Sequence, residues 1–175
     1  NLRSQWQREL AERFQIDAVQ LDRAVFDSVP TQNPWDVHDI VIVSRDFLKT
    51  DEVSAAFAAA EKDWDLAVID EAHGFTLEVD GKGLISKKSK RYKAAEQIAA
   101  KAHRLILLTA TPHSGRNESL WGLLRLLDPD AYGDRCPKHI ALNPRHYSKT
   151  SKEQMVDLRG EPLFKPRHPH TIGYE

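Results

Sequence analysis

The 175-residue chain has a hydrophobic fraction of 41%, which is enough for one sizeable core, so one or at most two domains are expected. Its formal net charge of −1 excludes a general attraction to nucleic acid, so any contact with DNA must come from local basic patches. A single cysteine, Cys136, excludes an intramolecular disulfide framework, and the lack of a bilayer-spanning apolar stretch or a signal-peptide pattern predicts a soluble, cytoplasmic protein.

The first half of the chain is predicted to alternate helices with short strands. Leu2, Trp6, Leu10 and Phe14 recur at helical spacing and predict an amphipathic helix at 2–14. Apolar runs and turn-forming residues place the elements that follow. These are a short strand at 16–21, a loop at 30–34, a buried strand at 40–43, a turn at 45–51 and an alanine-rich helix at 52–62.

The second half continues this alternation and then loses it. The expected elements are a buried strand within 64–73, an irregular insertion or hairpin at 74–89, a helix at 90–102, a strand at 105–108 and a helix at 117–127. Alternating strands and helices predict an α/β fold with a mainly parallel sheet covered on both faces. From Gly133 onward, prolines break the pattern, which predicts one domain at 1–132 and an extended arm at 133–175.

Two predicted strands end in polar clusters. The first ends in Asp70 and Glu71, and adjacent carboxylates can divide two tasks, since one can hold a hard cation through its water shell while the other orients an attacking water. Phosphoryl transfer from a nucleotide needs both functions. The second strand ends in Thr109, Ala110 and Thr111. Because parallel strands end at the same edge of a sheet, the two clusters are expected to face one crevice; simple turns and helix caps are the alternative.

These clusters carry a resemblance to a known family. Asp70-Glu71-Ala72-His73 resembles the Walker B box (motif II) of superfamily-two helicases, and Thr109-Ala110-Thr111 resembles their motif III, in the same order and at a similar separation. Within that superfamily the chain resembles the SWI/SNF-like branch of DNA translocases, and His113 after Pro112 agrees with its bacterial RapA-like and defence-associated members. Other segments that resemble this branch are 5–10, 39–45, 87–92, 111–115, 123–129 and 160–167.

The resemblance implies an ATPase that uses ATP and Mg²⁺. It implies a RecA-like three-layer α/β/α lobe. It assigns one residue to the metal: Asp70 would bind Mg²⁺ through the water shell of the ion. Glu71 is assigned to polarising the hydrolytic water, and His73 to the link between the nucleotide site and a second RecA-like lobe. A histidine that only packs at the surface is the alternative for His73.

The resemblance also implies contact with duplex DNA. Thr109, Ala110 and Thr111 would couple hydrolysis to the grip on nucleic acid. Ser44 and Arg45 occupy the position where the family touches the DNA backbone, and a hydroxyl beside a guanidinium suits phosphate. A solvated turn is an equally open interpretation of this pair.

One dense basic run interrupts an otherwise near-neutral chain. Its members are Lys87, Lys88, Lys90, Arg91 and Lys93, interleaved with Tyr92. Such a run is usually a solvated face. Cations at a helix start oppose the helix macrodipole, however, so contact of Lys87, Lys90 and Arg91 with DNA phosphate is the second interpretation.

Several family features are missing from the sequence. No segment reads Gly-Lys-Thr or Gly-Lys-Ser, the end of the loop that cradles nucleotide phosphates. The expectation is therefore an incomplete lobe without its first strands and phosphate loop, and an isolated chain that is inactive. The arginine finger of the family belongs to the second lobe.

Other functions stay open at this stage. A motor subunit of a restriction or RNA-helicase system is one alternative, because both motifs occur there, and a non-catalytic RecA-like interaction module is another. One thiol without a paired Cys-x-x-Cys makes zinc binding a weak hypothesis. Its candidate ligands are Cys136, His139, His146, His168 and His170.

Overall fold

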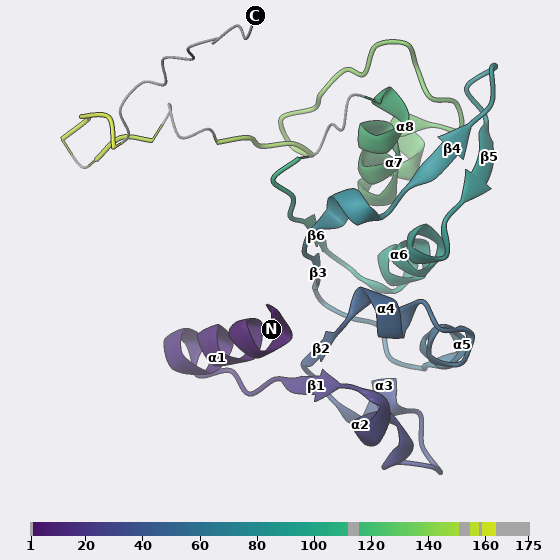
Figure 1. Ribbon diagram of the computed structural model, residues 1–175, viewed down its shortest axis with the longest axis vertical. Helices are drawn as coiled ribbons and strands as arrows, with labels where there is room; N and C mark the ends of the chain where they lie inside the picture. The colour runs from purple at the N-terminus through teal and green to yellow at the C-terminus, as the bar shows by residue number, and fades with distance from the viewer. Residues whose placement is uncertain (1, 112–115, 151–154, 158, 164–175) are drawn as a thin grey trace, which may run out of the picture. The chain divides into compact units, whose positions relative to one another are not determined.

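The computed structural model describes residues 2–111, 116–150, 155–157 and 159–163 (Figure 1). The chain divides into two compact units, Asn1–Ile140 and Ala141–Glu175. Residues just beyond 132 still belong to the first unit, because the backbone N–H of Cys136 donates to the carbonyl of Gly83 at 2.8 Å. In the described part of the chain, no helix is long and apolar enough to cross a membrane.

The first unit alternates strands and helices, as predicted. In chain order its elements are α1 (Leu2–Phe14), β1 (Val19–Leu21), α2 (Arg23–Asp27), α3 (Pro34–Val37), β2 (Val41–Val43), α4 (Arg45–Leu48), α5 (Asp51–Ala59), β3 (Ala67–Ile69), η1 (Ala72–Gly74), β4 (Leu77–Val79), β5 (Ile85–Lys88), α6 (Lys90–Lys101), β6 (Leu105–Leu107), α7 (Asn117–Leu127) and α8 (Pro129–Tyr132). In the second unit, an isolated antiparallel bridge joins Val156 to Pro162.

Two short helices correct the sequence prediction. The segment predicted as a turn at 45–51 contains α4, whose N-cap Ser44 accepts a hydrogen bond from Phe47 N at 3.1 Å. The segment predicted as a loop ends where α3 begins with Pro34, a residue that is favoured at the first helical position. Single helical turns carry no repeating apolar pattern, so periodicity did not reveal them.

Among the described residues, the strands form three pairs. β1 pairs with β2 in parallel, and β3 pairs with β6 in parallel with Val68 opposite Ile106. β4 and β5 form an antiparallel hairpin, as expected for 74–89. The parallel pairs and their helices form a partial RecA-like α/β domain, which confirms the predicted fold class.

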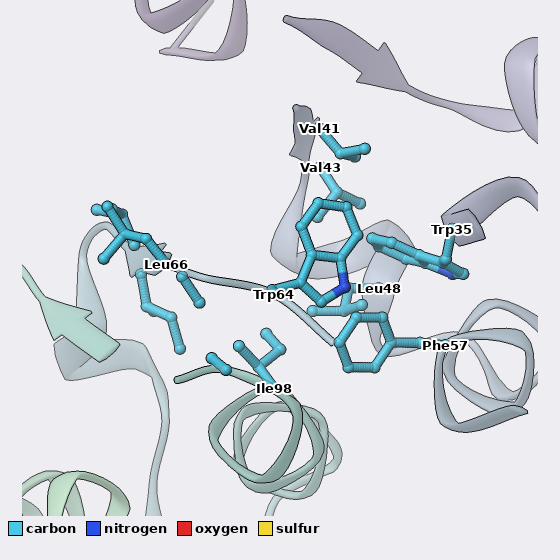
Figure 2. Close-up of a pocket in the computed structure, with 12 residues that line it drawn as sticks. Trp35, Val41, Val43, Leu48, Phe57, Trp64, Leu66 and Ile98 are labelled. Carbon is cyan, nitrogen blue, oxygen red and sulfur yellow. The ribbon is translucent and has the colours of Figure 1, made fainter. Parts of the chain in front are cut away.

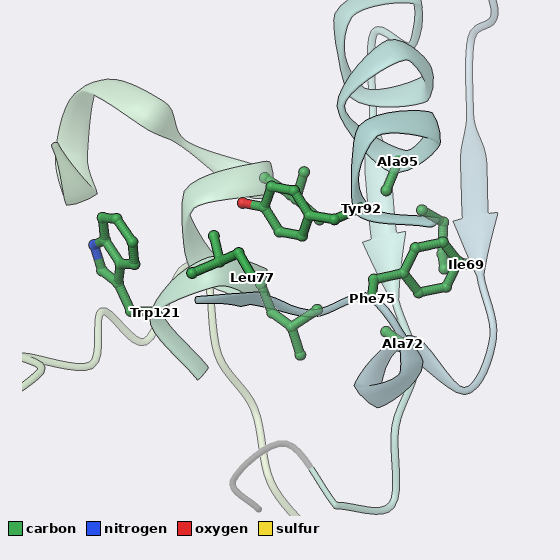
Figure 3. Packing of buried hydrophobic residues seen from close by; sticks show 9 residues of the cluster. Ile69, Ala72, Phe75, Leu77, Tyr92, Ala95 and Trp121 are labelled. Atoms are coloured by element: carbon green, nitrogen blue, oxygen red, sulfur yellow. The ribbon is translucent and has the colours of Figure 1, made fainter. Parts of the chain in front are cut away.

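Two hydrophobic clusters, formed by the described residues, hold this unit together. One contains the fully buried Tyr92 and Trp121, from α6 and α7, and packs against the β4 strand and the inner residue Ile69 of β3 (Figure 3). The other lies under β1 and β2. Its buried members are Leu21, Phe26, Trp35, Leu48, Val53, Phe57, Ala60 and Ala94.

One face of the β3–β6 pair stays open. Val68 and Ile106 are each 43% exposed, although the sequence predicted buried strands covered on both sides. Ile69 and Leu107 point to the opposite face and belong to the first cluster. The difference arises because successive strand residues alternate between faces, and within the described residues helices pack against only one of them.

Tyr92→Phe is expected to destabilise the first unit by about 1–2 kcal/mol. The Tyr92 hydroxyl donates to the carbonyl of Gly122 at 2.9 Å, and burial raises the pKa of Tyr92 to about 12. Removing the hydroxyl takes away this buried contact between α6 and α7 and leaves the Gly122 carbonyl with only its hydrogen bond inside the helix. Urea unfolding followed by tryptophan fluorescence measures the change. Tyr147→Phe in the second unit is the matched control, and an equal loss of stability in both variants would contradict the assignment.

Candidate functional site

The parallel pairing of β3 with β6 brings both predicted polar clusters together. Ile69 lies opposite Leu107, so the residues that follow each strand emerge at the same edge. Two further backbone bonds continue the pairing past the strands: Leu108 N donates to Ile69 O at 2.8 Å, and Ala72 N donates to Leu108 O at 2.9 Å. The acidic turn is thereby attached to the start of the Thr-Ala-Thr segment.

Asp70 is held by a partner that sequence analysis missed. Its Oδ2 accepts a hydrogen bond from Trp6 Nε1 at 3.0 Å, and its Oδ1 accepts from Glu71 N at 2.8 Å. Trp6 lies on α1, and its spacing predicted only the apolar face of an amphipathic helix. No local pattern links two residues 64 positions apart, so only the folded chain reveals this contact.

Asp70 fits the Mg²⁺ role that the resemblance implies. A carboxylate has about four acceptor positions, and the two hydrogen bonds to Asp70 leave others on the same oxygens. Mg²⁺ keeps much of its water shell in proteins and is commonly bound through one or two carboxylates. The carboxylate of Asp70 can therefore accept from a metal-bound water while both protein contacts persist.

The backbone of Glu71 adopts a left-handed conformation that is uncommon for a non-glycine residue. Its φ is 52°, which costs on the order of 1 kcal/mol or more. Arg45 stabilises this turn by donating from Nη1 to the Glu71 carbonyl at 3.0 Å. Gly74 leaves room for that guanidinium, because a Cβ at this position would lie 2.6 Å from Arg45 Nη1.

His73 joins the two clusters through side chains. Its Nδ1 lies 3.1 Å from Glu71 Oε2 and 3.3 Å from Thr109 Oγ1. The tautomer with a proton on Nδ1 donates to the carboxylate, whereas the other tautomer accepts from the threonine hydroxyl. Thr109 Oγ1 also accepts from Thr111 N at 3.1 Å, and Ala110 between them is exposed. A proton shift on one imidazole can therefore change which cluster His73 contacts.

Ser44 and Arg45 are both engaged inside the chain. The Ser44 hydroxyl caps α4, and the Arg45 guanidinium contacts the backbone of the acidic turn. Arg45 thus connects the predicted DNA-facing segment to Glu71 directly. This gives the pair a structural role that the sequence did not predict.

The basic run lies on β5 and at the start of α6, and four of its members face carboxylates. Their pairs are Lys87–Glu78 at 3.6 Å, Lys88–Glu96 at 2.7 Å, Lys90–Asp51 at 2.8 Å and Arg91–Asp46 at 2.6 Å. Hydrogen bonds from Lys49 and Arg91 lower the pKa of Asp46 to about 2, so this carboxylate is ionised near neutral pH. Arg91 Nη1 would also lie 3.9 Å from a Cβ on Gly74, which places it near the acidic turn.

The described residues contain no cluster of side chains that would support the zinc hypothesis. Within the described ranges, no three of the histidine, cysteine, aspartate and glutamate side chains lie close enough to hold a metal ion. Burial raises the pKa of the Cys136 thiol, which disfavours the thiolate that zinc binds. His168 and His170 lie outside the described residues.

A parallel strand pair that ends in Asp-Glu-Ala-His on one strand and Thr-Ala-Thr on the other is the arrangement of a superfamily-two helicase-like ATPase domain. The chain belongs to the SNF2-related domain family, which matches residues 1–160 and confirms the predicted SWI/SNF-like relationship.

Bacterial relatives are similar over most of this chain. The RNA polymerase-associated protein RapA of Pseudomonas putida (strain W619) is 32% identical over 98% of the chain, which corresponds to 17% of that protein. RapA of Stutzerimonas stutzeri (strain A1501) is 36% identical over 77% of the chain and 13% of its own length. The chain thus spans less than a fifth of these relatives.

The Trp6–Asp70 hydrogen bond is expected to be visible in the indole Nε1–H resonance of Trp6. Asp70→Ala removes the acceptor, so this resonance should shift and its proton should exchange faster with solvent. Glu71→Ala is the matched control, because Trp6 bonds to Asp70 and not to the Glu71 side chain. Heteronuclear NMR of both variants makes the comparison, and equal shifts in the two would show that the bond does not form.

Proposed function

We propose that this chain forms part of the first RecA-like lobe of an ATP-dependent DNA translocase. In the full-length protein, ATP hydrolysis with Mg²⁺ drives movement along duplex DNA. One observation supports this proposal most strongly: Asp70, Glu71, His73 and Thr109 lie together at one edge of the β3–β6 pair. Membership of the SNF2-related family supports it.

Each residue of the cluster has a role in the proposed reaction. Asp70, oriented by Trp6, holds the water shell of Mg²⁺, and Glu71 polarises the water that attacks the γ-phosphate. His73 lies between Glu71 and Thr109 and passes the state of the nucleotide site to the Thr-Ala-Thr segment and the second lobe. These groups supply only part of a hydrolysis site. The isolated chain is inactive in this proposal, since a phosphate cradle and an arginine finger must complete it.

The names of the relatives bear on the alternatives. RapA proteins are called RNA polymerase-associated, which favours a motor acting on duplex DNA in transcription over a restriction or RNA-helicase subunit. DNA-stimulated ATP hydrolysis by the full-length protein separates an enzyme from the non-catalytic interaction module.

Glu71→Gln in the full-length protein is expected to retain ATP binding and to reduce DNA-stimulated hydrolysis by roughly 10²–10⁴-fold. The amide keeps the shape of the side chain but cannot act as a base. ATPase rates with and without duplex DNA, together with the affinity for ATP, measure the effect. Glu61→Gln is the control, because Glu61 is exposed and belongs neither to the acidic turn nor to the pairs of the basic run. Normal turnover by Glu71→Gln would remove this residue from the mechanism.

The second test concerns DNA. The ion pairs of Lys87 and Lys90 are exposed, with lysine side chains 72% and 67% accessible. Exposed pairs contribute little stability, so DNA phosphates can replace the carboxylate partners. Replacing Lys87, Lys90 and Arg91 together by Ala should weaken DNA binding and reduce the salt slope by about 0.9 for each phosphate that the protein no longer neutralises.

The control for this triple variant removes the same charge elsewhere. It replaces the exposed residues Arg8, Arg13 and Arg104 by Ala. Binding to duplex DNA across a range of salt concentrations compares the two variants. If both slopes equal that of the unmodified protein, the run is a solvated face.

A further inference from the structure

The short helix α4 is anchored by packing, although it is only one turn long. Its last residue, Leu48, is 4% exposed and lies, together with Trp64, in the wall of an apolar cavity of about 110 Å³ (Figure 2). The ring of Phe47 packs edge-on against Phe26, with 5.9 Å between the ring centroids. The backbone of the first helical residue, Arg45, is therefore held in a fixed position.

Ionic contacts add to this anchoring. Asp46, the second residue of α4, accepts from Lys49 Nζ at 2.7 Å and from Arg91 Nη2 on α6 at 2.6 Å. Arg91 also lies close to the acidic turn, because its Nη1 would be 3.9 Å from a Cβ on Gly74. The Arg91–Asp46 pair is partly exposed and contributes little stability by itself, but it restrains α4 beside the acidic turn.

The Arg45 side chain reaches from α4 to a strained part of the candidate site. Glu71 has a φ of 52° and a ψ of 45°, a conformation that persists only where its surroundings support it. Its carbonyl accepts from Arg45 Nη1 at 3.0 Å and from Gly74 N at 3.1 Å. The bond from the guanidinium is the stronger of the two, since charge-assisted hydrogen bonds are roughly twice as strong as neutral ones. Arg45 thus opposes relaxation of the Glu71 backbone.

Gly74 is matched to this contact. A Cβ at position 74 would lie 2.6 Å from Nη1 and 3.6 Å from Cζ of Arg45, and the next nearest atom is Nη1 of Arg91. All three neighbours are guanidinium atoms, which can move because they end flexible side chains. Alanine at position 74 would therefore displace the Arg45 guanidinium from the Glu71 carbonyl without removing the arginine.

The direction of the Glu71 side chain depends on this backbone. The Cβ of a residue turns with its backbone dihedral angles, so relaxation at Glu71 would move the carboxylate, which now lies 3.1 Å from His73 Nδ1. A misplacement of about 1 Å in a catalytic site can reduce the rate about 10²-fold. A residue that fixes the Glu71 backbone therefore affects the position of the group that is proposed to polarise water.

We propose that Arg45 is a positioning residue for the candidate ATPase site. Its guanidinium holds Glu71 in the left-handed conformation that directs the carboxylate toward His73, and Gly74 provides the space that the guanidinium occupies. The inference rests on the proposed function, because Arg45 acts on hydrolysis through Glu71 and does not touch ATP. Contact with DNA phosphate, the role that the resemblance implies for Arg45, predicts a different result when the side chain is removed.

Kinetics of the full-length protein separate these roles. Arg45→Ala should lower kcat for DNA-stimulated ATP hydrolysis at least about tenfold and leave KM for ATP nearly unchanged, because the lost positioning matters in the transition state. The salt slope of DNA binding should equal that of the unmodified protein. Gly74→Ala should cause the same loss of kcat, and combining both substitutions should cause no further loss, since each removes the same contact.

Three results would overturn the proposal. They are an unchanged kcat in Arg45→Ala, losses that multiply in the double variant, and a salt slope reduced by about 0.9, which would assign Arg45 to a DNA phosphate. Gly81→Ala and Arg104→Ala are the matched controls and should keep the normal kcat. A Cβ on Gly81 meets nothing within 4 Å, and Arg104 is exposed and precedes β6, at the end of the strand away from the acidic turn.

Hydrogen exchange of the full-length protein without nucleotide tests the contact separately from catalysis. In Arg45→Ala, the peptide that covers residues 70–75 should exchange at least about threefold faster, because Gly74 N and Arg45 share the Glu71 carbonyl as acceptor. Unchanged exchange of this peptide would also overturn the proposal. If the unmodified protein hydrolyses no ATP while the faster exchange is observed, the proposed function fails and the contact between Arg45 and Glu71 stands. If ATP is hydrolysed and Arg45→Ala changes neither kcat nor exchange, only the positioning role fails.

Discussion

The parallel pairing of β3 with β6 is the constraint on which the candidate site depends. Three pairs of residues in register, from Ala67↔Leu105 to Ile69↔Leu107, bring together segments that lie far apart in the sequence. Because parallel strands end at the same edge, this pairing alone places an acidic turn beside a hydroxyl-bearing turn. The imidazole of His73 then lies within hydrogen-bond distance of both Glu71 and Thr109.

The acidic turn is fixed from several sides. The left-handed backbone of Glu71 is unfavourable on its own, and it persists because Arg45 binds its carbonyl and Ala72 N binds Leu108 O. Gly74 is required by the same contact, since any side chain there would meet the Arg45 guanidinium. A change near α4 can therefore reach the backbone of Glu71 through one hydrogen bond, which provides a short physical route between the predicted DNA-facing segment and the acidic turn.

The strands near the acidic turn are not fully covered by the described residues. Residues of β2 and β3 line an apolar cavity, and Val68 and Ile106 present apolar side chains on an uncovered face. In a parallel sheet both edges and both faces are normally covered, because unpaired backbone groups and exposed apolar surface are unfavourable. The chain spans 17% of the RapA protein of Pseudomonas putida (strain W619).

The sequence by itself determined the α/β class, α1, the strands that deliver the acids and threonines, and the family, because local apolar periodicity and short motifs encode them. It did not reveal that Trp6 holds Asp70, that Arg45 supports Glu71, or that the basic run faces carboxylates. It also did not reveal the apolar cavity lined by β2 and β3. These features depend on contacts between residues distant in the chain, and a local pattern carries no information about which distant side chain will arrive; only the tertiary structure decides that.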